Sequence, residues 1–258
     1  MESQVPTKIE SSSNPRIVRI LKYLHGRNKQ IWLLEGKKLI DEAARSGVTL
    51  EEIFVIRSFW EKELKWLQSL QTSIFLVTAT LLKQLSGVQS PQGVVAAARR
   101  IIPREIRQIT HGFGTLLYSI RDPGNFGAIL RTAEAAGCSF VGYTSDCVDP
   151  YQPKVVRGSM GTILRMSLSE VREPLGFLNK LKENGVRRYA LFPTGGSNLF
   201  ALKPQYPCLV IIGSESQGLP QDLAVDERLS IPMAGKINSL NAAVAAGVCF
   251  YHFTQSLR

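Results

Sequence analysis

Short apolar runs alternate with amphipathic segments along the first hundred residues. After a polar stretch, residues 1–13, which we expect to be flexible, Ile17, Ile20 and Leu24 recur at helical spacing with basic residues on the other side. This pattern predicts a basic helix that begins after Asn14-Pro15. Alternation of strands and helices then predicts an N-terminal α/β domain over residues 1–100. We expect its strands at residues 31–34, 53–56, 74–77 and 93–98, and its further helices at residues 39–44, 59–70 and 81–85.

The second half of the chain carries more strongly apolar strands. Strands are expected at residues 115–119, 140–143, 163–168, 189–192, 208–213 and 229–231, and helices at residues 129–136, 174–184 and 239–254. Apolar strands of this kind suit burial on both faces, so residues 113–258 are predicted to form an α/β domain with a mainly parallel sheet. Ser239 is the expected N-cap of the last helix. Residues 101–112 are polar and basic and contain a proline, which predicts a linker.

Composition narrows the class of protein. The chain has 258 residues, of which 44% are hydrophobic, and its net charge is +10. The excess of basic residues is concentrated in residues 1–107, which carry 17 basic and 10 acidic side chains, and it favours a polyanionic partner such as nucleic acid. The four cysteines and three histidines lack metal-ligand spacing, so we expect no metal. The polar N-terminus and the short apolar runs predict a cytoplasmic protein with no membrane segment.

Three glycine-containing loops each follow a predicted strand: residues 120–127, 214–218 and 232–238. Ligands bind at the carboxyl ends of strands in open α/β sheets, which makes these loops the candidate site. They fit neither a dinucleotide-binding fingerprint nor a Walker A loop. The candidate side chains in or beside them are Asn125, Arg131, Glu215, Ser239 and Asn241. Taken singly, each has a commoner structural reading as a turn, cap or surface residue.

Taken together, these segments carry a resemblance. The second half contains, in order, Asn125-x-Gly127-x-x-x-Arg131, Gly213-x-Glu215-x-x-Gly218-Leu219 and Ile231-Pro232-Met233-x-Gly235-x-x-x-Ser239-Leu240-Asn241. These resemble the three motifs of the SpoU/TrmH family, within the SPOUT superfamily of RNA methyltransferases. The first half resembles that family's RNA-binding extension in Asn14-Pro15, Leu34-Glu35-Gly36 and Pro91-Gln92-Gly93-Val94. The stretch Pro153-Lys154-x-Val156-Arg157-x-Ser159-x-Gly161 resembles its middle segment.

The resemblance implies a fold, a cofactor and partners. The C-terminal domain would contain a deep trefoil knot, and the last helix would lie beside the knot in a homodimer interface. S-adenosylmethionine would be the methyl donor, held by main chain at Gly213, Ile231 and Leu240, with Thr194 near its adenine. The catalytic positions would be Asn125, Arg131, Glu215, Ser239 and Asn241. The RNA-binding positions would be Arg16, Arg19, Arg27, Lys154 and Arg157.

A role for Arg131 follows from its chemistry. A guanidinium group stays protonated in proteins, so we expect Arg131 to bind phosphate or stabilise a developing alkoxide rather than to act as a base. Asn125 and Glu215 are expected to fix its orientation. The resemblance implies that Arg131 would face the cofactor of the partner subunit. The proton acceptor stays open between an RNA phosphate, water and Glu215.

The interpretation is therefore an S-adenosylmethionine-dependent RNA ribose 2′-O-methyltransferase. The N-terminal extension favours ribosomal RNA over transfer RNA as the substrate, and tRNA methylation remains an alternative. A second alternative is a non-catalytic RNA-binding or ribosome-assembly factor with the same fold. A third, a nucleotide-binding enzyme with a small-molecule substrate, leaves the basic first domain unexplained.

Overall fold

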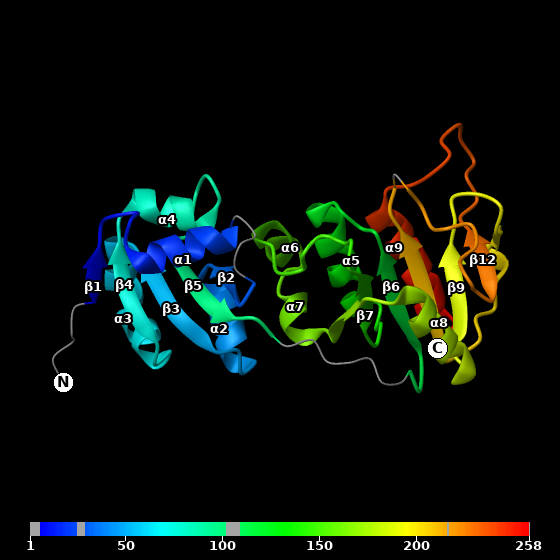
Figure 1. Cartoon of the computed structure of the whole chain (residues 1–258), viewed down its shortest axis with the longest axis horizontal. Coiled ribbons are helices and arrows are strands. Elements are labelled where there is room, and N and C mark those ends of the chain that lie inside the picture. The colour runs from blue at the N-terminus through cyan, green and yellow to red at the C-terminus, as the bar shows by residue number, and fades with distance from the viewer. Residues whose placement is uncertain (1–5, 25–28, 102–108, 216, 258) are drawn as a thin grey trace. The chain divides into compact units, whose positions relative to one another are not determined.

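The computed structural model describes residues 6–24, 29–101, 109–215 and 217–257 (Figure 1). Contacts divide the chain into two compact units. Unit 1 comprises Met1–Ile102 together with Tyr151–Val156, and unit 2 comprises Pro103–Pro150 together with Arg157–Arg258. Within the described ranges, no helix combines the length and the apolar character that crossing a membrane requires.

Unit 1 is built on a five-stranded sheet in the order β1-β4-β3-β5-β2. Strand β5 runs antiparallel to β2 and β3, whereas β1, β4 and β3 are parallel. The strands are β1 (Thr7–Ile9), β2 (Ile31–Glu35), β3 (Leu50–Val55), β4 (Ser73–Val77) and β5 (Val94–Arg99). The helices are α1 (Pro15–Leu24), α2 (Lys37–Arg45), α3 (Arg57–Ser69) and α4 (Ala79–Ser86). The predicted alternation of strands and helices is thus present.

Two features of unit 1 differ from the sequence prediction. Residues 1–13 were expected to be flexible, but β1 lies within them and pairs with β4. The apolar Ile9, only 4% exposed, anchors this otherwise polar strand. The second difference is the inclusion of Tyr151–Val156: the Tyr151 ring meets Trp32 of β2 edge to face at 5.2 Å, and the Tyr23 hydroxyl donates to the Tyr151 carbonyl. These contacts bury an edge strand that would otherwise expose apolar residues.

Unit 2 is built on a seven-stranded sheet in the order β10-β12-β9-β11-β6-β7-β8. Every strand pair is parallel, as the apolar strands predicted. The strands are β6 (Phe113–Tyr118), β7 (Val141–Thr144), β8 (Leu168–Val171), β9 (Arg187–Leu191), β10 (Ser197–Asn198), β11 (Cys208–Gly213) and β12 (Glu227–Ser230). The helices are α5 (Pro123–Ala135), α7 (Thr162–Arg165), α8 (Pro174–Glu183) and α9 (Ala242–Gln255), with a 3-10 helix, η1 (Leu199–Ala201). Helix α6 (Pro153–Gly158) begins in the Tyr151–Val156 segment of unit 1 and ends in unit 2.

The two faces of this sheet carry separate apolar layers. On one face Leu116 packs with Phe140 and with Leu178 of α8. On the other, Phe113 meets Phe250 and Phe253 of α9, each with a ring separation of 5.9 Å. The period-2 alternation of side chains along β6 sends neighbouring residues to opposite layers. The sheet is therefore buried on both faces, and its carboxyl ends remain accessible to a ligand.

One predicted strand of unit 2 is wrong. Residues 163–168 were expected to be extended, but the structure has α7 there, followed by β8. The Thr162 hydroxyl donates to Glu134 at 2.5 Å and the Leu164 amide donates to the Gly161 carbonyl at 2.9 Å, which closes a helical turn. A tertiary contact thus overrides local strand preference. Of the predicted linker, residues 102–108 lie outside the described residues, and Ile109, near its end, is buried in the core of unit 2.

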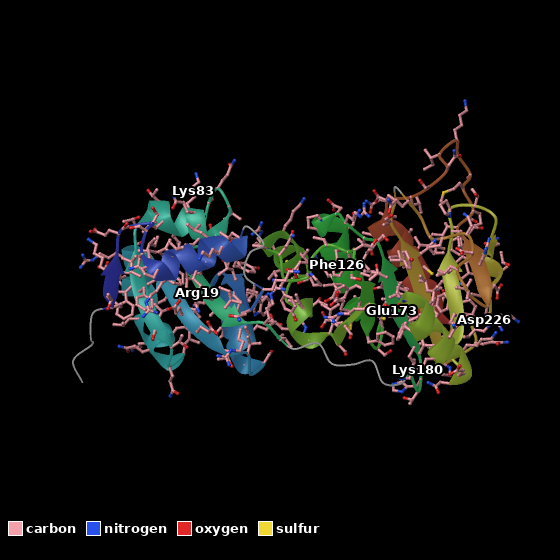
Figure 2. All side chains as sticks on the ribbon, viewed as in Figure 1. Arg19, Lys83, Phe126, Glu173, Lys180 and Asp226 are labelled. Carbon is pink, nitrogen blue, oxygen red and sulfur yellow. The ribbon has the colours of Figure 1, made fainter. Side chains whose placement is uncertain are left out.

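A buried ion pair ties β9 to the segment before β12. The Arg188 side chain is 3% exposed, and it donates to Asp226 through Nε at 2.9 Å and Nη2 at 3.0 Å (Asp226 is labelled in Figure 2). These hydrogen bonds hold the pKa of Asp226 below its ordinary value, an effect that outweighs burial. Since the folded-state pKa is lowered, the stabilisation is present above the unfolded-state pKa and is lost as pH falls through the folded-state pKa.

We predict that Asp226→Asn lowers the free energy of unfolding by about 3 kcal/mol at pH 7, because it leaves the Arg188 charge buried without a counterion. The variant also loses part of the fall in stability that the native protein shows below about pH 4. Urea unfolding between pH 7 and pH 3 measures both effects. Asp222→Asn is the matched control at an exposed position; an equal effect of the two substitutions contradicts the prediction.

Candidate functional site

A pocket lies at the carboxyl ends of β9, β11 and β12. It is a half-open recess with about 60 Å³ of interior space, or about 540 Å³ when the space at its open mouth is counted. Of the described residues that line it, Glu215 alone is charged and most others are apolar. The lining residues are Leu191, Phe192, Pro193, Ile212, Gly213, Ser214, Glu215, Gly218, Ile231, Met233, Ser239, Leu240, Ala242 and Ala245.

Three side chains in or beside the three predicted loops meet at the rim of this pocket. Asn125 Nδ2 donates to Glu215 Oε1 at 3.1 Å, and Asn241 Nδ2 donates to Asn125 Oδ1 at 2.9 Å. Glu215 Oε1 also accepts from the Ala242 amide at 2.7 Å. The first turn of α5, the loop after β11 and the start of α9 are therefore joined by one hydrogen-bonded network. The sequence placed these residues in one site, and the structure brings them together.

The start of α9 corrects one expectation. Asn241, not Ser239, caps the helix: its Oδ1 accepts from the amides of Ala243 at 3.0 Å and Val244 at 3.3 Å. The helix consequently begins at Ala242, and Ser239 is left in the loop, where it lines the pocket. An Asn at this position serves both the helix and the rim, because its oxygen caps while its amide nitrogen reaches Asn125.

The loop after β11 folds back tightly on itself. Ser214 and Gly218 form an isolated antiparallel bridge, and Gly218 has a φ of +66°. A Cβ at Gly213 would lie 2.8 Å from the Gly218 carbonyl carbon and oxygen, so a side chain there would force the loop open. The close approach is the physical reason for glycine at position 213, and the positive φ is the reason at position 218. Both residues line the pocket.

Hydrogen bonds hold the turn between β6 and α5, which positions Asn125. Asp122 caps α5 by accepting from the Asn125 amide at 2.7 Å. Before it, the Ser119 hydroxyl donates to Asp146, which also accepts from Thr144 at 2.5 Å. Burial raises the pKa of Asp146, but these two hydrogen bonds, a backbone hydrogen bond and the charge of Arg121 together hold the pKa below its ordinary value. A charged Asp146 therefore anchors the turn between β6 and α5 at neutral pH.

Most predicted cofactor positions reach the pocket. Gly213, Ile231 and Leu240 line it. Thr194 is exposed and is not part of the lining, although its neighbour Pro193 is. Sequence reasoning missed Pro193, Met233 and the small residues Ala242 and Ala245 as pocket residues. The available signal was their position next to, or within, the segments already selected.

Arg131 stands apart from the network. It lies on α5 six residues after Asn125, which at 3.6 residues per turn puts it on a different side of the helix. Its side chain is exposed and has no hydrogen bond or ion pair with the described residues. The expectation that Asn125 and Glu215 fix its orientation is therefore wrong within one chain, since those two groups bind each other and α9.

The predicted RNA-binding arginines of α1 have partners in unit 1. Arg16 is paired with Glu52, and Arg19 pairs with Glu51 at 2.8 Å and Glu52 at 2.6 Å (Arg19 is labelled in Figure 2). Strand β3 thus partly neutralises the basic face of this helix. Arg27 lies outside the described residues. Lys154 and Arg157 are exposed on α6.

The cysteines do not contribute a reactive group. Cys138, Cys208 and Cys249 are buried free thiols, and burial raises the pKa of Cys138 to about 12 and raises those of the other two as well. Buried thiols with raised pKa values are poor nucleophiles. In the part of the chain that the structure describes, no group of three His, Cys, Asp or Glu side chains could hold a metal ion.

Comparison with known proteins identifies both units. The model of the SpoU rRNA methylase family matches residues 113–251, and the model of the MRM3-like substrate binding domain matches residues 14–96. The chain is 34% identical to a protein of Synechocystis named as an uncharacterized tRNA/rRNA methyltransferase, over 94% of this chain and 92% of that one. It is 28% identical to the Bacillus subtilis 23S rRNA (guanosine(2553)-2′-O)-methyltransferase RlmP, over 95% and 98% of the two chains.

A solved structure agrees with these matches. The SpoU methyltransferase AviRb from Streptomyces viridochromogenes, in complex with the cofactor AdoMet, superposes with a TM-score of 0.84 at 27% identity. The match covers 94% of this chain and 97% of that one. The family model spans more than half of the chain, and it contains the residues of the rim network. The chain belongs to the SpoU rRNA methylase family.

Proposed function

We propose that this protein transfers a methyl group from S-adenosylmethionine to a ribose 2′-hydroxyl of ribosomal RNA. The observation that carries the proposal is the network of Asn125, Glu215 and Asn241 at the rim of a pocket lined by Gly213, Ile231 and Leu240. Three motifs that are distant in sequence converge there on one pocket. The relatives with the matching arrangement of units are methyltransferases by name.

The pocket residues fit this cofactor. An adenosyl group needs an apolar slot, which Ile231, Met233 and Leu240 offer, and strand ends provide main-chain groups for the edge of its base. The Glu215 carboxylate at the rim favours a cationic ligand. The bound cofactor supplies an activated methyl group on a sulfonium. The chain's own residues then have to position the ribose and manage the charge on its oxygen.

We assign different roles to the polar residues at the rim and to Arg131. Glu215 Oε1 already accepts two hydrogen bonds, so we assign Glu215 and Asn125 to shaping the site, together with Asn241 and Ser239. Arg131, exposed and without a partner among the described side chains, is available for the RNA. We propose that it contacts a phosphate or the developing alkoxide at the site of a partner subunit.

Two groups of relatives match different shares of this chain, and the difference favours ribosomal RNA over transfer RNA as the substrate. RlmP of B. subtilis, a 23S rRNA methyltransferase by name, matches over 95% of this chain. A structure described as giving insight into 2-OH methylation of C/U34 on tRNA matches over 57% of this chain, with a TM-score of 0.51. A substrate-binding unit shared with rRNA enzymes therefore supports rRNA as the substrate.

The test is methyl transfer from labelled S-adenosylmethionine to unmodified total RNA, followed by fractionation and nucleoside analysis. We expect a 2′-O-methylated nucleoside in the rRNA fraction. The same product in tRNA would show that the substrate is tRNA and that the proposed reaction is correct. If RNA binds but neither cofactor binding nor transfer is detected, the assembly-factor alternative holds instead.

We predict that Arg131→Lys lowers the turnover number about 100-fold or more, because an ammonium group does not reproduce the planar donors of a guanidinium. Single-turnover methyl transfer measures the effect, and S-adenosylmethionine affinity stays unchanged. Arg172→Lys is the matched control: Arg172 is 81% exposed by side chain and pairs only locally with Glu170. A near-normal rate for Arg131→Lys would show that our role for Arg131 is wrong.

We propose that residues 1–100 bind the RNA substrate, that residues 101–112 link the two domains, and that residues 113–258 hold the catalytic site. Arg16 and Arg19 are ion-paired, so their contribution to RNA binding requires exchange of Glu51 and Glu52 for phosphate. Lys154 and Arg157 are exposed, and we retain them as RNA contacts with Arg27. An rRNA substrate and buried free thiols support a cytoplasmic location.

We propose that the chain of unit 2 forms a deep trefoil knot. The strand order puts β9 and β12 beyond β11, yet α9, which follows β12, packs against α5 and β11. Residues 231–241 therefore have to return across the carboxyl ends of β9 and β11. A return of this kind supports threading past the loop after β11. The knot is an exception to the general rule for protein chains.

We also propose a homodimer formed through α9. Val244 and Tyr251 are 52% and 54% exposed, and seven residues separate them, so they share one face of the helix. Phe200, 59% exposed, lines a groove together with Tyr251 and Val248. Apolar residues gathered in this way mark an interaction surface.

We predict that Tyr251→Glu shifts the protein from dimer to monomer, because a buried carboxylate without a partner opposes association. Sedimentation velocity over a range of protein concentrations measures the change. Leu175→Glu is the control, since Leu175 is 60% exposed on α8, away from this groove. Dimers of unchanged stability in the Tyr251 variant would assign the interface to another surface.

A further inference from the structure

Met160 combines two features that oppose stability. It is 61% exposed, and its φ is +50°, in the left-handed region. A side chain with a Cβ is disfavoured in that conformation, and glycine would relieve the strain. Gly158 and Gly161 lie on either side, so this loop already uses glycine at nearby positions. An apolar side chain held in a strained and exposed position points to a function at that position.

The loop that presents Met160 is firmly held. The Met160 amide donates to the Arg157 carbonyl at 3.2 Å, and the Thr162 amide donates to the Ser159 carbonyl at 3.0 Å. Ser159 and Thr162 are buried to 0% and 1% exposure. The backbone on both sides of Met160 is therefore held by hydrogen bonds and buried neighbours, whereas the Met160 side chain itself is exposed.

The same loop crosses the face of α5 that carries Arg131. A Cβ at Gly158 would lie 3.4 Å from Gly127 Cα, and the Thr162 hydroxyl is 2.5 Å from Glu134. Gly127, Arg131 and Glu134 are spaced four and three residues apart, so they share one face of the helix. Arg131 is thus located between the two points at which residues 158–162 touch α5. Met160 belongs to the surface beside Arg131.

We propose that Met160 contacts the face of an unstacked nucleobase of the RNA substrate and so positions the strand beside Arg131. The inference rests on the proposed function. Single-stranded RNA is recognised by holding splayed bases against flat or apolar groups, and a thioether is polarizable and packs well against aromatic rings. Met160 has no donor or charge to read a base edge, so it holds a base of any identity.

The pocket side of α5 and the Met160 side are different parts of the site. Asn125, on the first turn of α5, reaches Glu215 and Asn241 at the pocket rim, whereas Gly127 and Arg131 face the Met160 loop. A helix is about 10 Å across with its side chains. Because Arg131 is proposed to act at the site of a partner subunit, the base on Met160 is assigned to the strand that enters that site, and not to a nucleotide at the pocket of its own chain.

Methionine oxidation gives a direct test. The chain has four methionines, and dilute hydrogen peroxide converts exposed ones to the sulfoxide. We expect an unmodified 23S rRNA transcript to slow oxidation of Met160, as followed by mass spectrometry, and S-adenosylmethionine alone to leave it unchanged. Met233, which lines the pocket, is the internal control and is expected to show protection by the cofactor. Unchanged oxidation of Met160 in saturating RNA overturns the proposal.

Met160 could instead be buried by a second copy of the chain. In that case Met160 is protected without RNA as protein concentration rises, and this result also overturns the proposal. The footprint requires RNA binding and no methyl transfer. A protein that protects Met160 but transfers no methyl group would therefore refute the proposed function and leave this inference intact.

Steady-state kinetics of Met160 variants test whether the contact affects the reaction. Met160→Gly removes the side chain and relieves the strained φ, so the variant is expected to fold with native or greater stability. We expect its KM for the 23S rRNA transcript to rise about two- to tenfold, the range of a sulfur–aromatic contact, with kcat and S-adenosylmethionine affinity retained. Met160→Leu keeps an apolar contact and recovers part of the loss.

Two matched controls separate this effect from its structural causes. Leu175→Ala removes a side chain of equal exposure, 60%, from α8. Gln71→Gly relieves a similar φ of +48° in unit 1. Both are expected to leave KM for RNA unchanged. A Met160→Gly enzyme with native KM, or a rise in KM equal to that of the controls, rules out contact with a base.

Discussion

The site depends on a single carboxylate oxygen. Glu215 Oε1 accepts from the Asn125 side chain and from the Ala242 amide, and in this way holds the starts of α5 and α9 against the loop after β11. Parallel strands alone would deliver these three loops to the same edge of the sheet. They would not fix the separation between the loops, which determines the width of the pocket. A hydrogen-bonded carboxylate does so while leaving the pocket walls apolar.

Several charged side chains elsewhere in the chain also have specific partners. In unit 2 the buried Arg188 has a bidentate partner in Asp226, and in unit 1 the basic helix α1 is matched by the acidic start of β3. Arg131 differs, because it has neither an ion pair nor a hydrogen bond within the described part of the chain. A cation left in this state retains its full capacity to bind an anion. The contrast separates arginines that support the fold from the one to which we assign a role in RNA binding.

The sequence predicted the parts that depend on short-range patterns. Apolar runs gave the parallel sheet, and motif spacing brought Asn125, Glu215 and Asn241 to one site. The cap of α9 was placed two residues early, because Asn241 and not Ser239 makes the local capping hydrogen bonds. The other errors arose where a distant contact decides the outcome. Glu134 holds Thr162 and turns a predicted strand into α7, and Ile9 pairs the predicted flexible tail with β4. Neither periodicity nor composition carries information about such partners, which lie far away along the chain.

The membership of Tyr151–Val156 in unit 1 affects how the chain could be divided. Because this segment lies between two stretches of unit 2, the backbone passes from one unit to the other three times, near residues 102, 150 and 156. A single cut after residue 102 would leave unit 2 carrying a segment whose Tyr151 has lost its Trp32. Unit 1 is therefore not a detachable module. An engineered or ancestral exchange of the first hundred residues would have to replace two separate pieces of sequence together.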